Sequence, residues 1–275
     1  MGIPTGITLY TSATPNGIKI SILLEELGLE YKVSPPAVLP LRQDHRQGER
    51  RGADQQQTHA IDITTNEQKK DWFLAINPNG RIPALTDTWH DGSEVAIFES
   101  GAIMEYLVDR YDTEHRVSYP RDTKEHWQVS SWVMWQMGGL GPMQGQSNHF
   151  KRYAPEKIQY GIERYGNETR RLYSVMDAHL AKSPSGFLVG DRCTAADISC
   201  WGWVASYAWA GIKMDGYPAL KAWLYKLLER PGFEKGRHVP KPHMAFKYAE
   251  MTDEELNERA RAASAWVQQS QKLTK

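Results

Sequence analysis

All segments that are typical of β-strands fall within the first hundred residues of this chain. Runs of β-branched and aromatic residues predict strands at 7–10, 82–86 and 95–98, and helical periodicity predicts helices at 17–29 and 101–110. Beyond Asp122 only helical patterns remain, at residues 124–137, 155–181, 195–209 and 219–230. The sequence therefore predicts an α/β domain followed by an all-α helical bundle.

A length of 275 residues also favours two domains, since one domain usually takes about 100 to 200 residues. The composition changes over 109–122, where Tyr119-Pro120 would interrupt a helix. We therefore expect an α/β domain at 5–112, a helical domain at 122–237 and a C-terminal extension at 238–275. In that extension Thr252 and Glu255 have the spacing of a capping box, which predicts a polar helix through Trp266.

Composition excludes several classes of function. Lys plus Arg and Asp plus Glu each number 33, so the formal charge is zero and we expect neither a nucleic-acid partner nor a membrane surface. No apolar run reaches the roughly 18 residues of a membrane span. Cys193 and Cys200 form neither a CxxC pair nor a zinc knuckle, so we expect no metal, ordinary reduced thiols and a cytoplasmic protein.

The stretch 36–58 begins with prolines and continues with charged residues and glutamines that have no apolar period. Such a composition does not stabilise a packed element, so we expect an exposed loop inserted into the α/β domain.

The segment from Thr14 to Lys19 joins the first predicted strand to the first predicted helix. The hydroxyl of Thr14 and the amide of Asn16 would lie at a helix N-terminus, where unpaired N–H groups and the helix dipole favour an anion or a thiolate. Gly17 would allow the backbone to approach a ligand closely. The alternative is that Thr14 and Asn16 simply cap the helix.

A second pattern is the turn at 77–81 followed by a strand with proline near its start. A cis Ile82-Pro83 bond would leave the Ile82 amide free to pair with an extended peptide ligand. The alternative is an edge strand that contains a trans proline.

Glu99 and Ser100 come directly before the helical pattern at 101–110. The Ser100 hydroxyl and the first helical amides suit a carboxylate, and Glu99 suits an ammonium group, so the pair matches the head of an α-amino acid. The alternative is that Ser100 only caps its helix.

A thiol site, a peptide-backbone site and an amino-acid site together describe glutathione. At this point the chain resembles the glutathione transferase family, from Ile7 to Arg230, with a thioredoxin-like N-terminal domain and a helical C-terminal domain. The run WVMWQMGGLGPMQGQ at 132–146, with His149-Phe150 and the IERY sequence at 162–165, is similar to the nu-class bacterial transferases and to the yeast nitrogen-regulatory prion protein.

The resemblance implies glutathione as cosubstrate, a homodimer, and glutathione-dependent disulfide reduction or conjugation to a small electrophile. It assigns Thr14 and Asn16 to the glutathione sulfur. It also assigns glutathione binding to Gln68, Arg81, Ile82, Glu99, Ser100 and, from the helical domain, Arg164.

Two other functions stay open on the residues alone. The extra loop at 36–58 and the tail beyond Arg237 suit a biosynthetic transferase or isomerase dedicated to one natural-product intermediate. A glutathione-binding regulatory protein with weak activity is the other, although no long Asn/Gln-rich N-terminal tail precedes the first strand. We expect structural roles for the capping-box pattern of Thr194 with Asp197, and for His149.

Overall fold

The N-terminal part of the chain forms a four-stranded mixed sheet. The computed structural model describes residues 5–33 and 60–272, so the predicted loop at 36–58 lies outside the described residues. The strands are β1 (Thr8–Tyr10), β2 (Lys32–Val33), β3 (Ala84–Thr88) and β4 (Glu94–Phe98), in the order β2-β1-β3-β4. β1 runs parallel to β2, and β3 is antiparallel to both β1 and β4.

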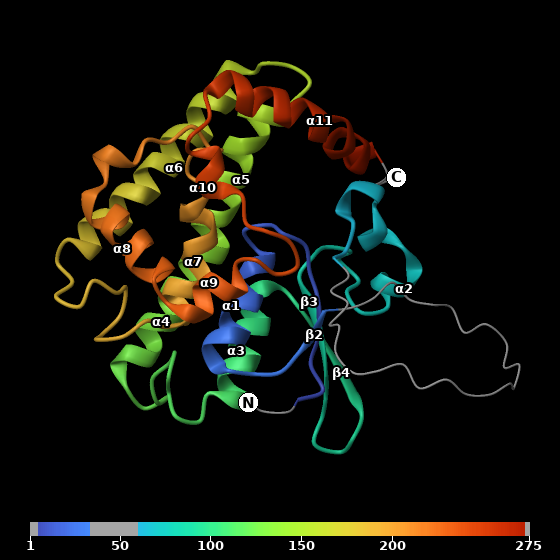
Figure 1. The fold of residues 1–275 in the computed structure, drawn as a ribbon, viewed down its shortest axis with the longest axis vertical. Coiled ribbons are helices and arrows are strands. Elements are labelled where there is room, and N and C mark those ends of the chain that lie inside the picture. The colour runs from blue at the N-terminus through green and yellow to red at the C-terminus, as the bar shows by residue number, and fades with distance from the viewer. Residues whose placement is uncertain (1–4, 34–59, 273–275) are drawn as a thin grey trace, which may run out of the picture.

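Helices cover both faces of this sheet (Figure 1). On the side of the helical region lie α1 (Gly17–Leu27) and α3 (Ser100–Tyr111), and on the other side lie α2 (Asp71–Leu74) and the short 3₁₀ segments η1 (Ile63–Thr65) and η2 (Glu67–Lys69). α1 buries almost its whole length because α3, α7 and α9 pack around it. The turn before α1 therefore lies where the two parts of the molecule meet.

The remainder of the described chain is helical. Its elements are α4 (Lys124–Trp135), the π-helical η3 (Gln136–Leu140), α5 (Gly141–Asn148), the π-helical η4 (His149–Tyr153), α6 (Gln159–Leu180), α7 (Ala195–Ala205), the 3₁₀ segment η5 (Met214–Gly216), α8 (Pro218–Leu228), α9 (Pro231–Gly236), α10 (Ala245–Tyr248) and α11 (Asp253–Lys272). α7 is the central helix, and every one of its residues is buried. The predicted Thr194 and Asp197 capping box is present at its start.

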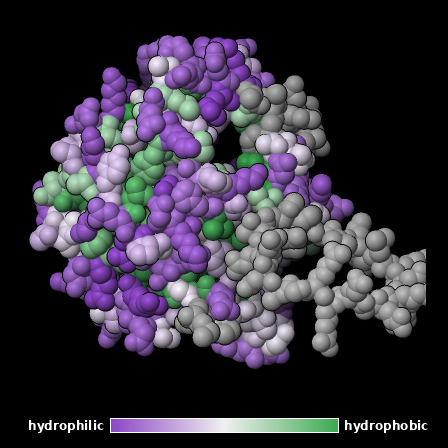
Figure 2. Space-filling view, in the orientation of Figure 1, coloured by the Kyte–Doolittle hydropathy of each residue, from purple (hydrophilic) through white to green (hydrophobic). Residues whose placement is uncertain are grey.

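The tail is docked against the body of the protein. Thr252 and Glu255 form the predicted capping box, and α11 continues beyond Trp266 to Lys272. α11 contacts both η4 and η1, so it reaches from the helical region to the part that contains the sheet. Figure 2 shows a hollow in the surface beneath α11, between these two parts.

Most predicted elements are confirmed, with differences at their ends. The helix predicted at 155–181 begins only at Gln159, and the one predicted at 195–209 ends at Ala205. The helix predicted to end at residue 137 changes to π-helix at Gln136, which apolar periodicity does not distinguish from α-helix. β2, the segment from η1 to α2, and α5 were not predicted, because each is too short or too polar to show a period.

The division into 5–112, 122–237 and 238–275 stays a prediction, although α3 ends at Tyr111 and α4 begins at Lys124. Within the described residues, no helix is long and apolar enough to cross a membrane. The same part of the chain holds no group of three His, Cys, Asp or Glu side chains that suits a metal ion.

Candidate active site

The turn between β1 and α1 brings Thr14 and Asn16 together at the start of the helix. Thr14 Oγ1 accepts a hydrogen bond from the Gly17 N–H at 3.1 Å, so Thr14 does cap the helix, and its hydroxyl hydrogen stays available. The turn itself requires Gly17, since a Cβ there would lie 2.1 Å from the Ser12 carbonyl oxygen. Close approach of a ligand to this backbone stays a prediction.

Asn16 is held from two sides through the oxygen of its side chain. Asn16 Oδ1 accepts one hydrogen bond from Lys19 Nζ and one from Trp203 Nε1, both at 2.9 Å. Asn16 Nδ2 has no partner among the described residues, so its two N–H groups remain as donors on this half-buried side chain. Gly202 lets α7 come this close, because a Cβ there would lie 2.8 Å from the Pro15 carbonyl oxygen.

The second predicted patch is a turn closed by a buried asparagine. Asn77 Oδ1 accepts from the Asn79 N–H at 2.9 Å, and Asn77 Nδ2 donates to the Arg81 carbonyl at 2.6 Å. The Ile82-Pro83 bond is cis, as predicted. The alternative of an edge strand was wrong, because β3 lies between β1 and β4 and begins after Pro83. No hydrogen bond within the described residues uses the Ile82 N–H.

Glu99 and Ser100 adjoin that turn. Glu99 Oε1 accepts from Asn79 Nδ2 at 3.2 Å, and Glu99 has a φ of 70°, a left-handed conformation that is uncommon for a residue other than glycine. Such strain clusters at functional sites and costs about 1–3 kcal/mol. Ser100 is not a cap, because the N-cap position is Glu99 and the Ser100 hydroxyl contacts Lys19 Nζ at 3.3 Å instead.

The remaining predicted residues lie in different places. Gln68 is buried, and its Oε1 has no hydrogen-bond partner in the part of the chain that the structure describes, although its backbone packs against the turn at Gly80. The Arg81 side chain is exposed. Arg164 lies on the exposed face of α6, in a surface pocket with Tyr160 and Glu163. Because α6 packs mainly on α5 and α8, the structure does not bring Arg164 to the other predicted residues within one chain.

Sequence reasoning missed the residues that support the turn from below. Lys19 is fully buried beneath Asn16 and also donates to Gln136 Oε1 of η3. Burial lowers the pKa of Lys19 to about 7, although nearby Cys200 and Glu99 act in the opposite direction. Gln136 and Trp203 belong to the helical region, and no local pattern connects them to the turn.

The protein's own thiols are unsuited to nucleophilic attack. Burial raises the pKa of Cys200 to about 12 and raises that of Cys193 well above its usual range. His149 packs its ring edge-on against Phe150. A thiolate at this site must therefore come from a ligand.

Known proteins are similar to this chain in sequence. Residues 14–110 match the glutathione S-transferase N-terminal domain, and residues 159–224 match the glutathione S-transferase C-terminal domain. The chain is 37% identical to the disulfide-bond oxidoreductase YfcG of Escherichia coli, covering 82% of this chain and 91% of that protein. It is 34% identical to the glutathione S-transferase-like protein gedE of Aspergillus terreus, covering 83% of this chain and 93% of that protein.

Solved structures agree in fold. A glutathione transferase homolog from Lodderomyces elongisporus with two GSH per subunit superposes with a TM-score of 0.73 at 39% identity, covering 85% of this chain and 98% of that one. The glutathione transferase URE2P6 of Phanerochaete chrysosporium in complex with oxidized glutathione superposes with a TM-score of 0.72 at 34% identity, covering 89% of this chain and 98% of that one. This chain belongs to the glutathione S-transferase family.

Proposed function

We propose that this protein is a glutathione-dependent disulfide reductase of the nu-class type that also transfers glutathione to electrophiles. Thr14 and Asn16 hold the glutathione sulfur, the Ile82 N–H pairs with the peptide backbone, and Glu99 and Ser100 hold the amino-acid head. Gln68 and Arg81 complete the glutathione site.

The geometry of Asn16 carries this proposal. Two donors occupy Asn16 Oδ1, which leaves Asn16 Nδ2 as the group available to a ligand. Together with the Thr14 hydroxyl and the N-terminus of α1, it provides hydrogen bonds and a positive dipole end, both of which stabilise a thiolate over a thiol. The related oxidoreductase YfcG and the neighbours that bind glutathione support the same chemistry.

The reduction proceeds through two glutathione molecules. The first thiolate attacks one sulfur of the substrate disulfide, so a mixed disulfide forms and the other substrate sulfur leaves and takes a proton. A second glutathione thiolate then attacks the glutathione sulfur of the mixed disulfide, which releases the second substrate thiol and glutathione disulfide. The Lodderomyces structure with two GSH per subunit supports a site of this capacity.

The test is the double variant Thr14→Ala with Asn16→Ala. Removing both donors should lower the rate of 2-hydroxyethyl disulfide reduction about 100-fold or more, by analogy with the loss of oxyanion donors in other enzymes. Thr88→Ala, at the opposite end of β3, is the matched control and should keep the wild-type rate. Unchanged rates of both disulfide reduction and chlorodinitrobenzene conjugation in the double variant would refute the proposal.

We also propose a homodimer and a cytoplasmic location. Large apolar side chains are exposed on α4 and on the edge strand β4: Trp127 is 63% exposed, Met134 49% and Phe98 38%. Exposed side chains of this kind suit contact with a second copy of the chain. Trp127→Glu should shift the mass measured by light scattering from dimer to monomer, and an unchanged mass would remove Trp127 from the interface. Two free buried cysteines suit a reducing compartment.

One observation favours the alternative of a transferase dedicated to a single electrophile. α11 joins η4 to η1 above the hollow between the two parts of the molecule, so it forms a wall where a substrate would enter. A chain ending at Met251 should accept a wider range of electrophiles if the tail selects the substrate. An unchanged range, measured over a panel of electrophiles of increasing size, would exclude that role.

A further inference from the structure

Lys19 is one of the largest fully buried side chains of the protein, with none of its surface exposed. Lysine is among the residues least often buried completely, so a buried ammonium group calls for specific partners. Lys19 is in the first turn of α1, directly after the turn that holds Thr14 and Asn16.

Three polar atoms surround Lys19 Nζ, and each comes from a different part of the fold. Asn16 Oδ1 belongs to the turn, Ser100 Oγ begins α3, and Gln136 Oε1 belongs to η3 of the helical region. An ammonium group has three N–H donors and no acceptor, so the number of partners matches the protonated form. Each partner must then point a lone pair at Nζ.

This requirement decides whether Asn16 and Ser100 donate or accept in their predicted hydrogen bonds to glutathione. Asn16 with its oxygen toward Lys19 has only Nδ2 left for a ligand. Ser100 with its lone pair toward Lys19 has its hydrogen left to donate, and its other contact is only a weak one to Met137 Sδ at 3.5 Å. Asn16 and Ser100 belong to opposite ends of the proposed glutathione site, the sulfur end and the amino-acid end.

We propose that Lys19 is a positioning residue that makes Asn16 and Ser100 hydrogen-bond donors toward the sulfur and the γ-glutamyl carboxylate of bound glutathione. The inference rests on the proposed function, because it deepens the role of the same site. The thiolate of the central cysteine and the carboxylate of the γ-glutamyl head are both anionic, so donors at both positions are what the ligand requires.

The surroundings leave the charge of Lys19 without a carboxylate in contact. The titratable groups that face it are Glu99 at the start of α3 and Cys200 on α7, and both act through space. Within the described residues no ion pair includes Lys19, and its three hydrogen-bond partners are neutral. A buried positive charge beneath the sulfur site favours a bound thiolate more strongly than an exposed one would.

The experiment measures the bound glutathione thiol directly. The variants are Lys19→Met, which keeps the length of the side chain without its donors, and Lys182→Met, the same change at an exposed site just after α6. The thiolate is followed by its ultraviolet absorbance across a pH titration of the full chain, alongside kcat and KM for glutathione. We expect the thiol pKa in Lys19→Met to rise by about one unit and the KM for glutathione to rise about tenfold.

The outcomes separate the two proposals. A wild-type chain that neither binds glutathione nor lowers its thiol pKa would overturn the proposed function and this inference together. A wild-type chain that does both, with a folded Lys19→Met variant that equals it and Lys182→Met, would overturn this inference alone.

A second variant decides the matter if Lys19→Met does not fold. Gln136→Met removes one acceptor of Lys19 from the side away from glutathione, which weakens the ammonium form. We expect it to raise the thiol pKa in the same direction by a smaller amount. A folded Gln136→Met variant with the wild-type thiol pKa would overturn the inference.

Discussion

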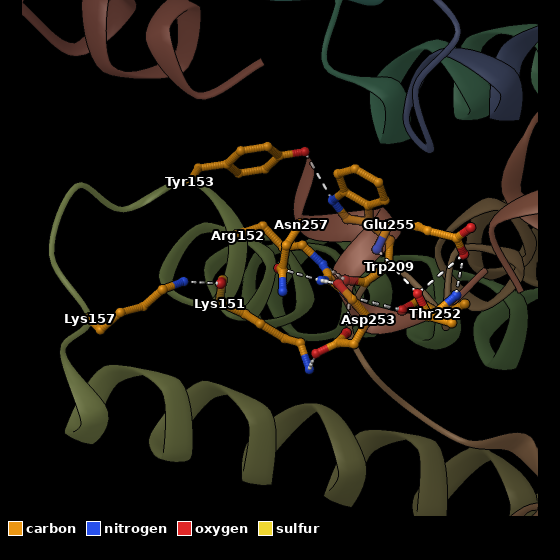
Figure 3. Close-up of polar contacts among 10 residues, drawn as sticks. Lys151, Arg152, Tyr153, Lys157, Trp209, Thr252, Asp253, Glu255 and Asn257 are labelled. Carbon is orange, nitrogen blue, oxygen red and sulfur yellow. Dashed lines mark hydrogen bonds and ion pairs between the residues drawn. The ribbon is translucent and has the colours of Figure 1, made fainter. Parts of the chain in front are cut away.

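Two buried cations connect distant parts of this protein, and they do so with different partners. Lys19 bonds to an amide oxygen, a hydroxyl and a second amide oxygen, all of them neutral. Arg152 of η4 donates to the Trp209 carbonyl at 2.9 Å, to Asn257 Oδ1 at 2.7 Å and to Asp253 Oδ1 at 2.7 Å. Figure 3 shows the Arg152 guanidinium between α11 and the helical region.

The two sites differ in whether a carboxylate neutralises the buried positive charge. The carboxylate of Asp253 neutralises Arg152, and its second oxygen forms an ion pair with Lys151 Nζ at 3.4 Å. This tail cluster therefore attaches α11 to the body of the protein. Among the described residues Lys19 has no such partner in contact, so below its pKa of about 7 its charge is available to a ligand above it. A buried cation paired with a carboxylate therefore anchors an element, whereas one paired with neutral acceptors keeps its electric field.

The largest effect that tests this comparison concerns the attachment of α11. Arg152→Met removes the two strong hydrogen bonds to α11, at Asp253 and Asn257, which should weaken docking by about 3 kcal/mol and raise hydrogen exchange in 253–272 about 100-fold. Lys19→Met should leave that exchange unchanged. Arg261→Met, on an exposed position of α11, is the matched control. Wild-type exchange of the tail in Arg152→Met would show that other contacts hold α11.

The next effect is the contribution of Lys19 to the dependence of stability on pH. Its folded-state pKa of about 7 lies below the usual 10.5, so between these values the unfolded chain keeps a proton that the folded chain has released. The free energy of unfolding of the wild type, relative to Lys19→Met, should therefore rise with pH over this window, by at most about 1.4 kcal/mol per unit. Urea unfolding from pH 6 to 10 measures it.

Arg152→Met is the control for this window, because it leaves Lys19 in place and should keep the pH dependence of the wild type. Parallel curves for the wild type and Lys19→Met would mean that Lys19 keeps its proton in the folded protein.

A smaller effect compares two indole N–H groups. That of Trp203 donates to the side chain of Asn16, and that of Trp209 donates to Tyr153. Trp203→Phe removes the Nε1 donor to Asn16 Oδ1 and should lower the disulfide reduction rate about fivefold, with a nearly unchanged KM for glutathione. Trp209→Phe removes the corresponding donor to Tyr153 OH in the tail cluster and should leave that rate unchanged for a small disulfide. Equal rates for both variants would argue against support of Asn16 by α7.

The smallest effect comes from the partly exposed member of the tail cluster. Burial is the largest single influence on the pKa of Asp253 and raises it, but the hydrogen bonds and charges of Arg152 and Lys151 together outweigh burial and hold that pKa below its usual range. Its contribution to docking is therefore present at neutral pH and lost as pH falls through the depressed value. Asp253→Asn should raise tail exchange severalfold at pH 7, corresponding to about 1 kcal/mol, and have no effect in strong acid. If the difference in tail exchange between Asp253→Asn and the wild type does not change with pH, the shape of the Asp253 side chain rather than its charge holds α11.

Much of the site was predictable because its parts are local. The turn at Thr14 and Asn16, the cis bond at Ile82-Pro83 and the Glu99-Ser100 step each combine a strand end with a helix start or a proline, and such signals span only a few residues. Together these three local signals indicate glutathione as the ligand. The left-handed backbone of Glu99 was not predictable, because only the surrounding fold holds a glutamate in that conformation.

The tail and the support of the site were harder to predict. The capping-box pattern of Thr252 and Glu255 predicted α11. No local sequence pattern, however, pairs Asp253 with Arg152, which lies 101 positions earlier. Arg164 shows the opposite problem: a resemblance placed it in the glutathione site, whereas the single chain places it on the outer face of α6. Its role stays a prediction that depends on the partner subunit of the proposed homodimer.

By itself the sequence determined the order of strands and helices, the chemistry of the turns and the ligand they suit, because propensity, capping and proline effects act over neighbouring residues. Only the tertiary structure decided what orients those turns. Gln136 lies 117 positions after Lys19, and Trp203 lies 187 after Asn16, yet both reach the thiol site because α7 packs against α1 and η3 packs against α7. Hydrogen-bond polarity at the site therefore depends on packing between distant segments, which no local pattern encodes.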